Sequence, residues 1–372
     1  VRLINADGHT LWQETYDRSV AQAFAVQDEV AKGVAGALLG QSNRAADNQR
    51  TPRTQTDFQT YDLYLRGRYA WWNAQSEVAV RQSIGYFRRA LARDSTFAPA
   101  WVGLADAFLR LTSSYDVAPA EVVPTARAAL LRARALDPAL ADVHASLGFL
   151  ATFHERRWSE AEADFRRALR LDVRHANARL WYGWLLSARG RHEEAVQQIR
   201  EAQTHQPYSP LLNVRLATML YFARDFEGAA RQSRAAIAAD STFWLPHRQL
   251  GEALLASGRG AEAVSFMRRA AELAPSSETR ARLAYALAKT GNREAARAIL
   301  AQLVAADSAT YVNPVELARV HVGLGETEPA LLLLERGVGV GASIAIMLNV
   351  EPMFDPLRRE PRFQTLITRL GL

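Results

Sequence analysis

The chain has 372 residues, of which 49% are hydrophobic, and its 45 basic and 39 acidic side chains give a net charge of +6. Nearly all the basic residues are arginine, and no basic run interleaves with aromatic residues, so the composition disfavours nucleic acid as a partner. The absence of cysteine excludes disulfides, thiolate metal sites and cysteine nucleophiles.

Two short alternating stretches begin the chain, at residues 1–5 and 10–16, on either side of Asp7 and Gly8. An Asp-Gly pair between such stretches predicts a β-hairpin. Residues 19–39 follow with apolar side chains such as Phe24 and Val34 at helical spacing, which predicts an amphipathic helix. Residues 41–60 lose this pattern and are predicted to be a linker. Because the chain starts at Val1, within a predicted strand, we expect it to be part of a longer protein.

A repeat of 34 residues dominates the rest of the chain. Gly183, Ala217 and Gly251 each precede a leucine three residues later and alanines twelve and nineteen residues later. In this frame the small residue of each unit falls at Gly67, Ala105, Gly148, Gly183, Ala217, Gly251, Ala284 and Ala318. A helix-turn-helix unit with this spacing resembles a tetratricopeptide (TPR) repeat. We therefore expect an all-α, right-handed superhelical solenoid of about eight repeats over residues 61–348.

The first two repeats carry extra residues, about four around positions 73–80 and about nine around positions 113–124, which are predicted to form loops. The most apolar stretch, residues 330–350, is interrupted by Glu335 and Arg336 and is not expected to enter a membrane. Residues 349–372 end in a short amphipathic segment, which is predicted to be a capping helix because a solenoid must cover its last repeat.

No pattern in the chain predicts an enzyme. The eight histidines show neither a HExxH motif nor any paired metal-ligand spacing. Residues 144–148 (HASLG) resemble a nucleophile elbow, but they fall in a predicted helix rather than a strand-to-helix turn. The glycines of residues 337–341 are predicted to form a loop after the last repeat. We therefore expect no catalytic residue, no metal and no cofactor.

The first helix of each TPR repeat lines the concave groove of the superhelix, so its exposed residues are the candidate binding surface. Aromatic and arginine side chains, which dominate interface hot spots, recur there. The predicted partner-binding residues are Tyr64, Arg68, Trp72, Phe149, Phe153, Trp184, Tyr221, Phe222 and Arg248. These residues favour a protein or peptide partner. In the alternative, several rings pack between neighbouring first helices or against the N-terminal hairpin and helix folded into the groove.

Several passages resemble a bacterial family in which a signalling domain precedes a TolB-N-like (FlgO-like) α/β domain and a TPR array. They are residues 7–18 (DGHTLWQETYDR), 24–30 (FAVQDEV), 61–68 (YDLYLRGR), 354–358 (FDPLR) and 361–363 (PRF). The resemblance implies that residues 1–40 are the end of the TolB-N-like domain.

Members of this family carry a Ser/Thr kinase, an adenylate or guanylate cyclase or a winged-helix regulator at the N-terminus, usually before a membrane segment. The resemblance thus implies a sensory or scaffolding arm on the periplasmic side, with the cytoplasm as the alternative, and an effector domain ahead of Val1. Two other hypotheses stay open at this point: a freestanding assembly scaffold and, less favoured, a nucleic-acid-binding solenoid.

Overall fold

The computed structural model describes residues 2–4, 10–13, 56–74, 76–206, 209–309 and 311–372. Within the predicted hairpin, β1 (Arg2–Ile4) and β2 (Thr10–Gln13) pair antiparallel. The predicted helix at residues 19–39 and most of the predicted linker lie outside the described residues.

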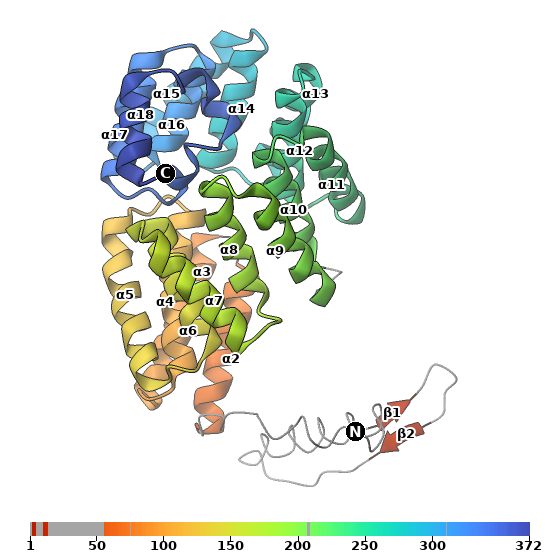
Figure 1. Ribbon diagram of the computed structural model, residues 1–372, viewed down its shortest axis with the longest axis vertical. Coiled ribbons are helices and arrows are strands. Elements are labelled where there is room, and N and C mark those ends of the chain that lie inside the picture. Colours follow the sequence, from red (N-terminus) through yellow and green to blue (C-terminus); the bar gives the residue numbers. More distant parts are fainter. Residues whose placement is uncertain (1, 5–9, 14–55, 75, 207–208, 310) are drawn as a thin grey trace.

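Eight helix pairs follow one another along the described chain and stack into a curved array (Figure 1). They are α2 (Phe58–Trp72) with α3 (Glu77–Arg93), α4 (Ala98–Ser114) with α5 (Pro119–Leu136), α6 (Ala141–Leu150) with α7 (Trp158–Leu171), α8 (Ala176–Ala188) with α9 (His192–His205), α10 (Pro210–Phe222) with α11 (Phe226–Ala239), α12 (Trp244–Ala256) with α13 (Gly260–Leu273), α14 (Ser277–Lys289) with α15 (Arg293–Ala309), and α16 (Pro314–Gly323) with α17 (Thr327–Gly339). The first helix of repeat three, α6, continues as a π-helical turn, η4 (Ala151–Glu155). The predicted all-α solenoid is confirmed.

The small residues that define the period lie where the two helices of a repeat cross. A Cβ atom at Gly148 would come within 2.7 Å of the Phe165 ring on α7, and one at Gly251 within 2.5 Å of the Met267 side chain on α13. Since real Cβ atoms do not approach this closely, only glycine fits there without moving its neighbour. Elsewhere the same position holds a fully buried alanine, as at Ala217.

The extra residues of repeat two do not form the predicted loop. They lengthen the helices instead, since α4 has 17 residues and α5 has 18, compared with 13 and 14 in α8 and α9. Only residues 115–118 connect α4 to α5. Likewise, Gly337 and Gly339 belong to the last turn of α17 rather than to a loop, and Gly341, at φ 74°, follows that helix.

The C-terminal segment, residues 343–372, does more than cap the last repeat. It comprises two 3₁₀ helices, η5 (Ser343–Met347) and η6 (Pro352–Leu357), and α18 (Pro361–Leu370). Helix α18 lies against α17, while η5 also contacts α4, η4 and α8. Figure 1 shows these blue helices above the yellow and green helices of repeats two to four. The array therefore curls until its end meets its early repeats.

Candidate functional site

A row of aromatic rings runs along successive first helices and contains most of the predicted binding residues. Phe149 and Phe153 stack with ring centroids 4.4 Å apart. Phe153 lies 6.2 Å from Trp184, which in turn lies 5.6 Å from Phe222. Tyr221 continues the row, 5.7 Å from Phe222. Rings at these separations attract one another, so the predicted residues of repeats three to five form one continuous cluster.

Most of that row is buried. Phe149, Phe153, Tyr221 and Phe222 are all less than 10% exposed, whereas Trp184 remains half-buried. The C-terminal segment covers part of this row of rings. The Tyr221 hydroxyl donates a hydrogen bond of 3.0 Å to Glu351 in the C-terminal segment. Trp184 is thus the one ring of this row that is partly exposed, and partner binding at all five rings stays a prediction.

Two arginines, each in the turn between the two helices of a repeat, tie the end of the chain to repeats three and five. Arg156, Gly190, Arg224 and Gly258 occupy equivalent positions 34 residues apart, and all have positive φ. Among the described residues, Arg156 (φ 57°) and Arg224 (φ 66°) are the only non-glycine residues with positive φ. Arg156 donates to the Val338 carbonyl at 3.0 Å, and Arg224 forms bonds of 2.5 and 2.8 Å to Asp355. Each departure from glycine is thus accompanied by a contact with the end of the chain, with α17 for Arg156 and with the C-terminal segment for Arg224.

The first repeat presents the predicted residues Tyr64, Arg68 and Trp72 at the other end of the array. The Arg68 guanidinium lies 5.3 Å from the Trp71 ring centroid and 5.9 Å from that of Trp72, within cation–π range. Trp72 is 51% exposed, and Tyr64 is half-buried. The structure therefore separates these three residues from the aromatic row of repeats three to five and leaves them reachable from solvent.

Arg68 also lies near a buried carboxyl group. Its Nη1 atom is 3.6 Å from Oδ2 of Asp106, whose Oδ1 atom accepts a bond of 2.6 Å from the Ser146 hydroxyl. Burial raises the pKa of Asp106 to about 6, and the nearby positive charge and the hydrogen bond only partly oppose this shift. The concave side of repeats one to three thus contains a carboxyl group that titrates in mildly acidic solution.

A chain of buried ion pairs connects the first helices of repeats six to eight. It runs Arg248–Glu252–Arg282–Glu316–Arg319–Glu351, with successive distances of 2.7, 2.6, 2.8, 3.2 and 3.3 Å. Of these residues only Arg248 was predicted as a binding residue. The signal for the others is visible in the sequence, because Arg248, Arg282 and Glu316 lie 34 residues apart inside otherwise apolar first helices. The pairs connect α12, α14 and α16 to the C-terminal segment.

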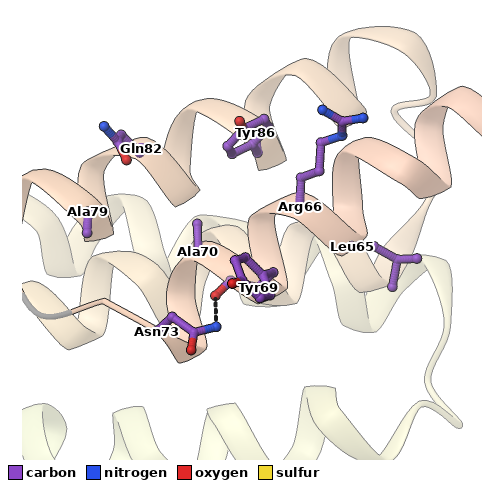
Figure 2. Close-up of a pocket in the computed structure, with 8 residues that line it drawn as sticks. All are labelled: Leu65, Arg66, Tyr69, Ala70, Asn73, Ala79, Gln82 and Tyr86. Atoms are coloured by element: carbon purple, nitrogen blue, oxygen red, sulfur yellow. Dashed lines mark hydrogen bonds between the residues drawn. The ribbon is translucent and has the colours of Figure 1, made fainter.

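A shallow pocket of about 500 Å³ lies between α2 and α3, on repeat one. Figure 2 shows the residues that line it: Leu65, Arg66, Tyr69, Ala70, Asn73, Ala79, Gln82 and Tyr86. The Asn73 amide donates to the Tyr69 carbonyl at 2.9 Å, and the Tyr69 side chain is 72% exposed. None of the predicted binding residues lines this pocket.

The described ranges contain no group of three or more histidine, aspartate or glutamate side chains placed to hold a metal ion. Instead, described histidines bond to acidic side chains, as in His144 with Asp164 at 2.9 Å and His321 with Glu326 at 2.7 Å. No described helix is both long and apolar enough to cross a bilayer. Residues 144–148 lie within α6, as predicted.

Tetratricopeptide-repeat family models match the chain at residues 153–210, 214–278 and 254–313. The chain is also 36% identical over 99 residues to the putative adenylate cyclase 3 of Rhizobium meliloti (strain 1021). That match covers 26% of this chain and only 16% of the relative, so the chain corresponds to a small part of that protein.

Among solved structures, the array is similar to the Cut9–Hcn1 hetero-tetramer of the APC/C, with a TM-score of 0.56, 16% identity and coverage of 83% of this chain and 55% of the other. PilW, a type IV pilus biogenesis factor, has a TM-score of 0.47 and 19% identity over 60% of this chain and 97% of its own. PilF of Pseudomonas aeruginosa has a TM-score of 0.43 and 20% identity over 59% and 95%. At these identities the likeness shows the fold alone. The chain therefore contains tetratricopeptide repeats.

Proposed function

We propose that this array of tetratricopeptide repeats binds a protein or peptide partner in its concave groove and is the sensory or scaffolding arm of a larger bacterial signalling protein. The fold supports the first part, because stacked helix pairs create extended concave surfaces that such proteins use for binding. The observation that carries the proposal is the row of rings on successive first helices, with Trp184 half-buried at its accessible side.

The accessible members of the predicted set, Tyr64, Arg68, Trp72 and Trp184, are proposed to touch the partner directly. Phe149, Phe153, Tyr221, Phe222 and Arg248 are proposed to support that surface from beneath, because they are buried. Large rigid aromatic anchors backed by a packed layer are typical of interface hot spots.

The signalling role rests on the adenylate cyclase relative and on the family resemblance of residues 7–18 and 354–363. We propose that residues 1–40 end a TolB-N-like domain and that residues 41–60 connect it to the array. An effector upstream of Val1, such as a cyclase or a kinase, would then respond to partner occupancy of the groove.

Site-specific photo-crosslinking tests the binding proposal. A photoreactive amino acid replaces Trp184 in the full chain, and a matched chain carries it at Leu332, which is 58% exposed on α17. In the bacterial host, position 184 is expected to crosslink a discrete protein that position 332 does not, and reciprocal capture of that protein should recover the array. Equal labelling at both positions, or no product at position 184, would contradict a partner site in the groove.

A further inference from the structure

Arg215, on α10, is a half-buried arginine with no hydrogen bond or salt bridge to any residue in the described part of the chain. Its guanidinium lies 5.5 Å from the ring centroid of Trp184 on the preceding first helix. Its Nε atom is buried and has no acceptor. Stacking on a ring compensates only part of the cost of removing a guanidinium from water, so Arg215 carries unused hydrogen-bonding capacity beside the accessible ring.

Other buried arginines of the array pair with carboxylates, although one guanidinium nitrogen of Arg248 and two of Arg319 also lack an acceptor. Arg179 pairs with Glu201, Arg282 with Glu252 and Glu316, and Arg319 with Glu316 and Glu351. Buried polar groups in folded proteins are nearly always hydrogen-bonded, and an exception in a concave surface is typical of a functional position. Arg215 differs from these arginines in that it pairs with no carboxylate of the described chain.

Arg248, on the next first helix, adds a second donor. Its Nη1 atom donates to Glu252 at 2.7 Å, but its Nε atom is buried without an acceptor and lies 3.7 Å from Glu278. Burial and then the charge of Arg248 lower the pKa of Arg215 to about 10, and the charge of Glu278 partly opposes this shift. Glu278 pairs with Arg248 but forms no salt bridge with Arg215, so the Arg215 guanidinium still favours a carboxylate as its acceptor.

We propose, building on the proposed function, that Arg215 and Arg248 bind the carboxylate of an acidic side chain in an extended partner segment, with Trp184 packing against an apolar residue beside it. A carboxylate matches the forked donors of a guanidinium. Its single charge matches the single guanidinium, Arg215, that has no carboxylate partner, whereas a doubly charged phosphate would add repulsion from Glu278.

The inner surface of this chain already binds acidic side chains in the same manner. In the C-terminal segment, Glu351 accepts from Tyr221 and pairs with Arg319, and Asp355 pairs with Arg224. The site at Arg215 differs in that no residue of the described chain occupies it.

Selection from a random 12-residue phage-displayed peptide library by the full chain tests the proposal. Wild-type protein should enrich peptides with Asp or Glu next to an apolar residue. Replacing that acid by its amide in a selected peptide should weaken binding about tenfold or more, the loss of a charged hydrogen bond. The Arg215→Met variant should not enrich them. No enrichment, enrichment without acidic preference, or equal selection by the variant would overturn the proposal.

Thermal melting distinguishes a binding residue from a structural one. Arg215→Met removes an uncompensated charge and should raise Tm by about 1–3 °C, whereas the control Arg179→Met breaks a buried pair and should lower it. Equal destabilisation by both changes would assign Arg215 a structural role.

Competition experiments at equal ionic strength distinguish a carboxylate ligand from a phosphate ligand. Sodium glutarate should displace a selected peptide better than inorganic phosphate does. The opposite order would indicate that the site binds a phosphate group rather than a carboxylate. If Trp184 crosslinks a partner while peptide selection shows no acidic preference, only this inference fails. If crosslinking fails, the proposed function fails whatever the peptides show.

Discussion

Asp106 shows how a single buried residue makes the stability of the array depend on pH. Burial raises its pKa from 3.8 to about 6, so the folded chain binds a proton at this carboxyl group more tightly than the unfolded chain does. The stabilising effect of that proton is complete below pH 4 and is lost as the pH rises through about 6. A shift of this size corresponds to about 3 kcal/mol of unfolding free energy.

We predict that Asp106→Asn removes this contribution. The stability of the variant relative to wild type should rise by up to about 3 kcal/mol between pH 4 and pH 7, measured by urea unfolding at both values. Ser146→Ala is the companion variant: it deletes a hydrogen bond that lowers the pKa of Asp106 and should make the loss of stability with pH steeper. Parallel pH profiles for wild type and Asp106→Asn would rule out this assignment.

At the scale of the element, the turn between the two helices of repeats three to eight contains one residue with positive φ, which is glycine in four repeats and arginine in two. Glycine adopts positive φ without strain, whereas an L side chain in the left-handed region costs about 1–2 kcal/mol. Arg156 and Arg224 occupy that position nevertheless; Arg156 reaches α17 and Arg224 reaches the C-terminal segment. The exposed pair of Arg224 with Asp355 contributes only about 0–1 kcal/mol, so at this turn the strain and the contact nearly cancel.

Two substitutions at Arg224 distinguish the backbone strain at this residue from its ion pair with Asp355. Arg224→Ala keeps the strained turn and loses Asp355, so its unfolding midpoint should fall by the equivalent of about 1 kcal/mol, while Arg224→Gly should match wild type. Both variants should speed amide hydrogen exchange in residues 351–357, measured by mass spectrometry. Unchanged exchange there in both would show that Arg224 does not hold the C-terminal segment.

The elements themselves could be predicted from the sequence because close helix crossing restricts particular positions to small residues. Gly148 and Gly251 are required by Phe165 and Met267, and the period they set gave the number of helix pairs. The extra residues of repeat two were assigned to a loop, since repeat spacing alone cannot tell a longer helix from a longer turn. The cover over Tyr221 also escaped prediction, because it depends on contacts between residues more than a hundred positions apart.

At the scale of the whole molecule, small rotations between repeats accumulate until distant parts of the chain touch. The Trp158 indole donates to the Leu370 carbonyl at 2.9 Å, across 212 positions of sequence. Ser277, at the start of α14, donates to Asp116 in the α4–α5 connection at 2.6 Å. In a solenoid each repeat ordinarily contacts only its neighbours. These long-range contacts therefore make repeats two to four and the C-terminal end depend on each other.

Trp158→Ala tests whether those contacts keep the array closed. The variant loses the bond to Leu370, the stacking of Arg189 on the indole and the packing of Trp158 on the hydrophobic core. We expect a larger radius of gyration by small-angle X-ray scattering and about tenfold faster amide exchange in residues 361–372, with helical content unchanged. Trp101→Ala is the matched control, because that indole is also half-buried but donates locally, to Ser95 at 2.9 Å. If both variants scatter like wild type, closure does not depend on Trp158. If both expand equally, the effect reflects loss of a buried ring rather than the opening of a long-range contact.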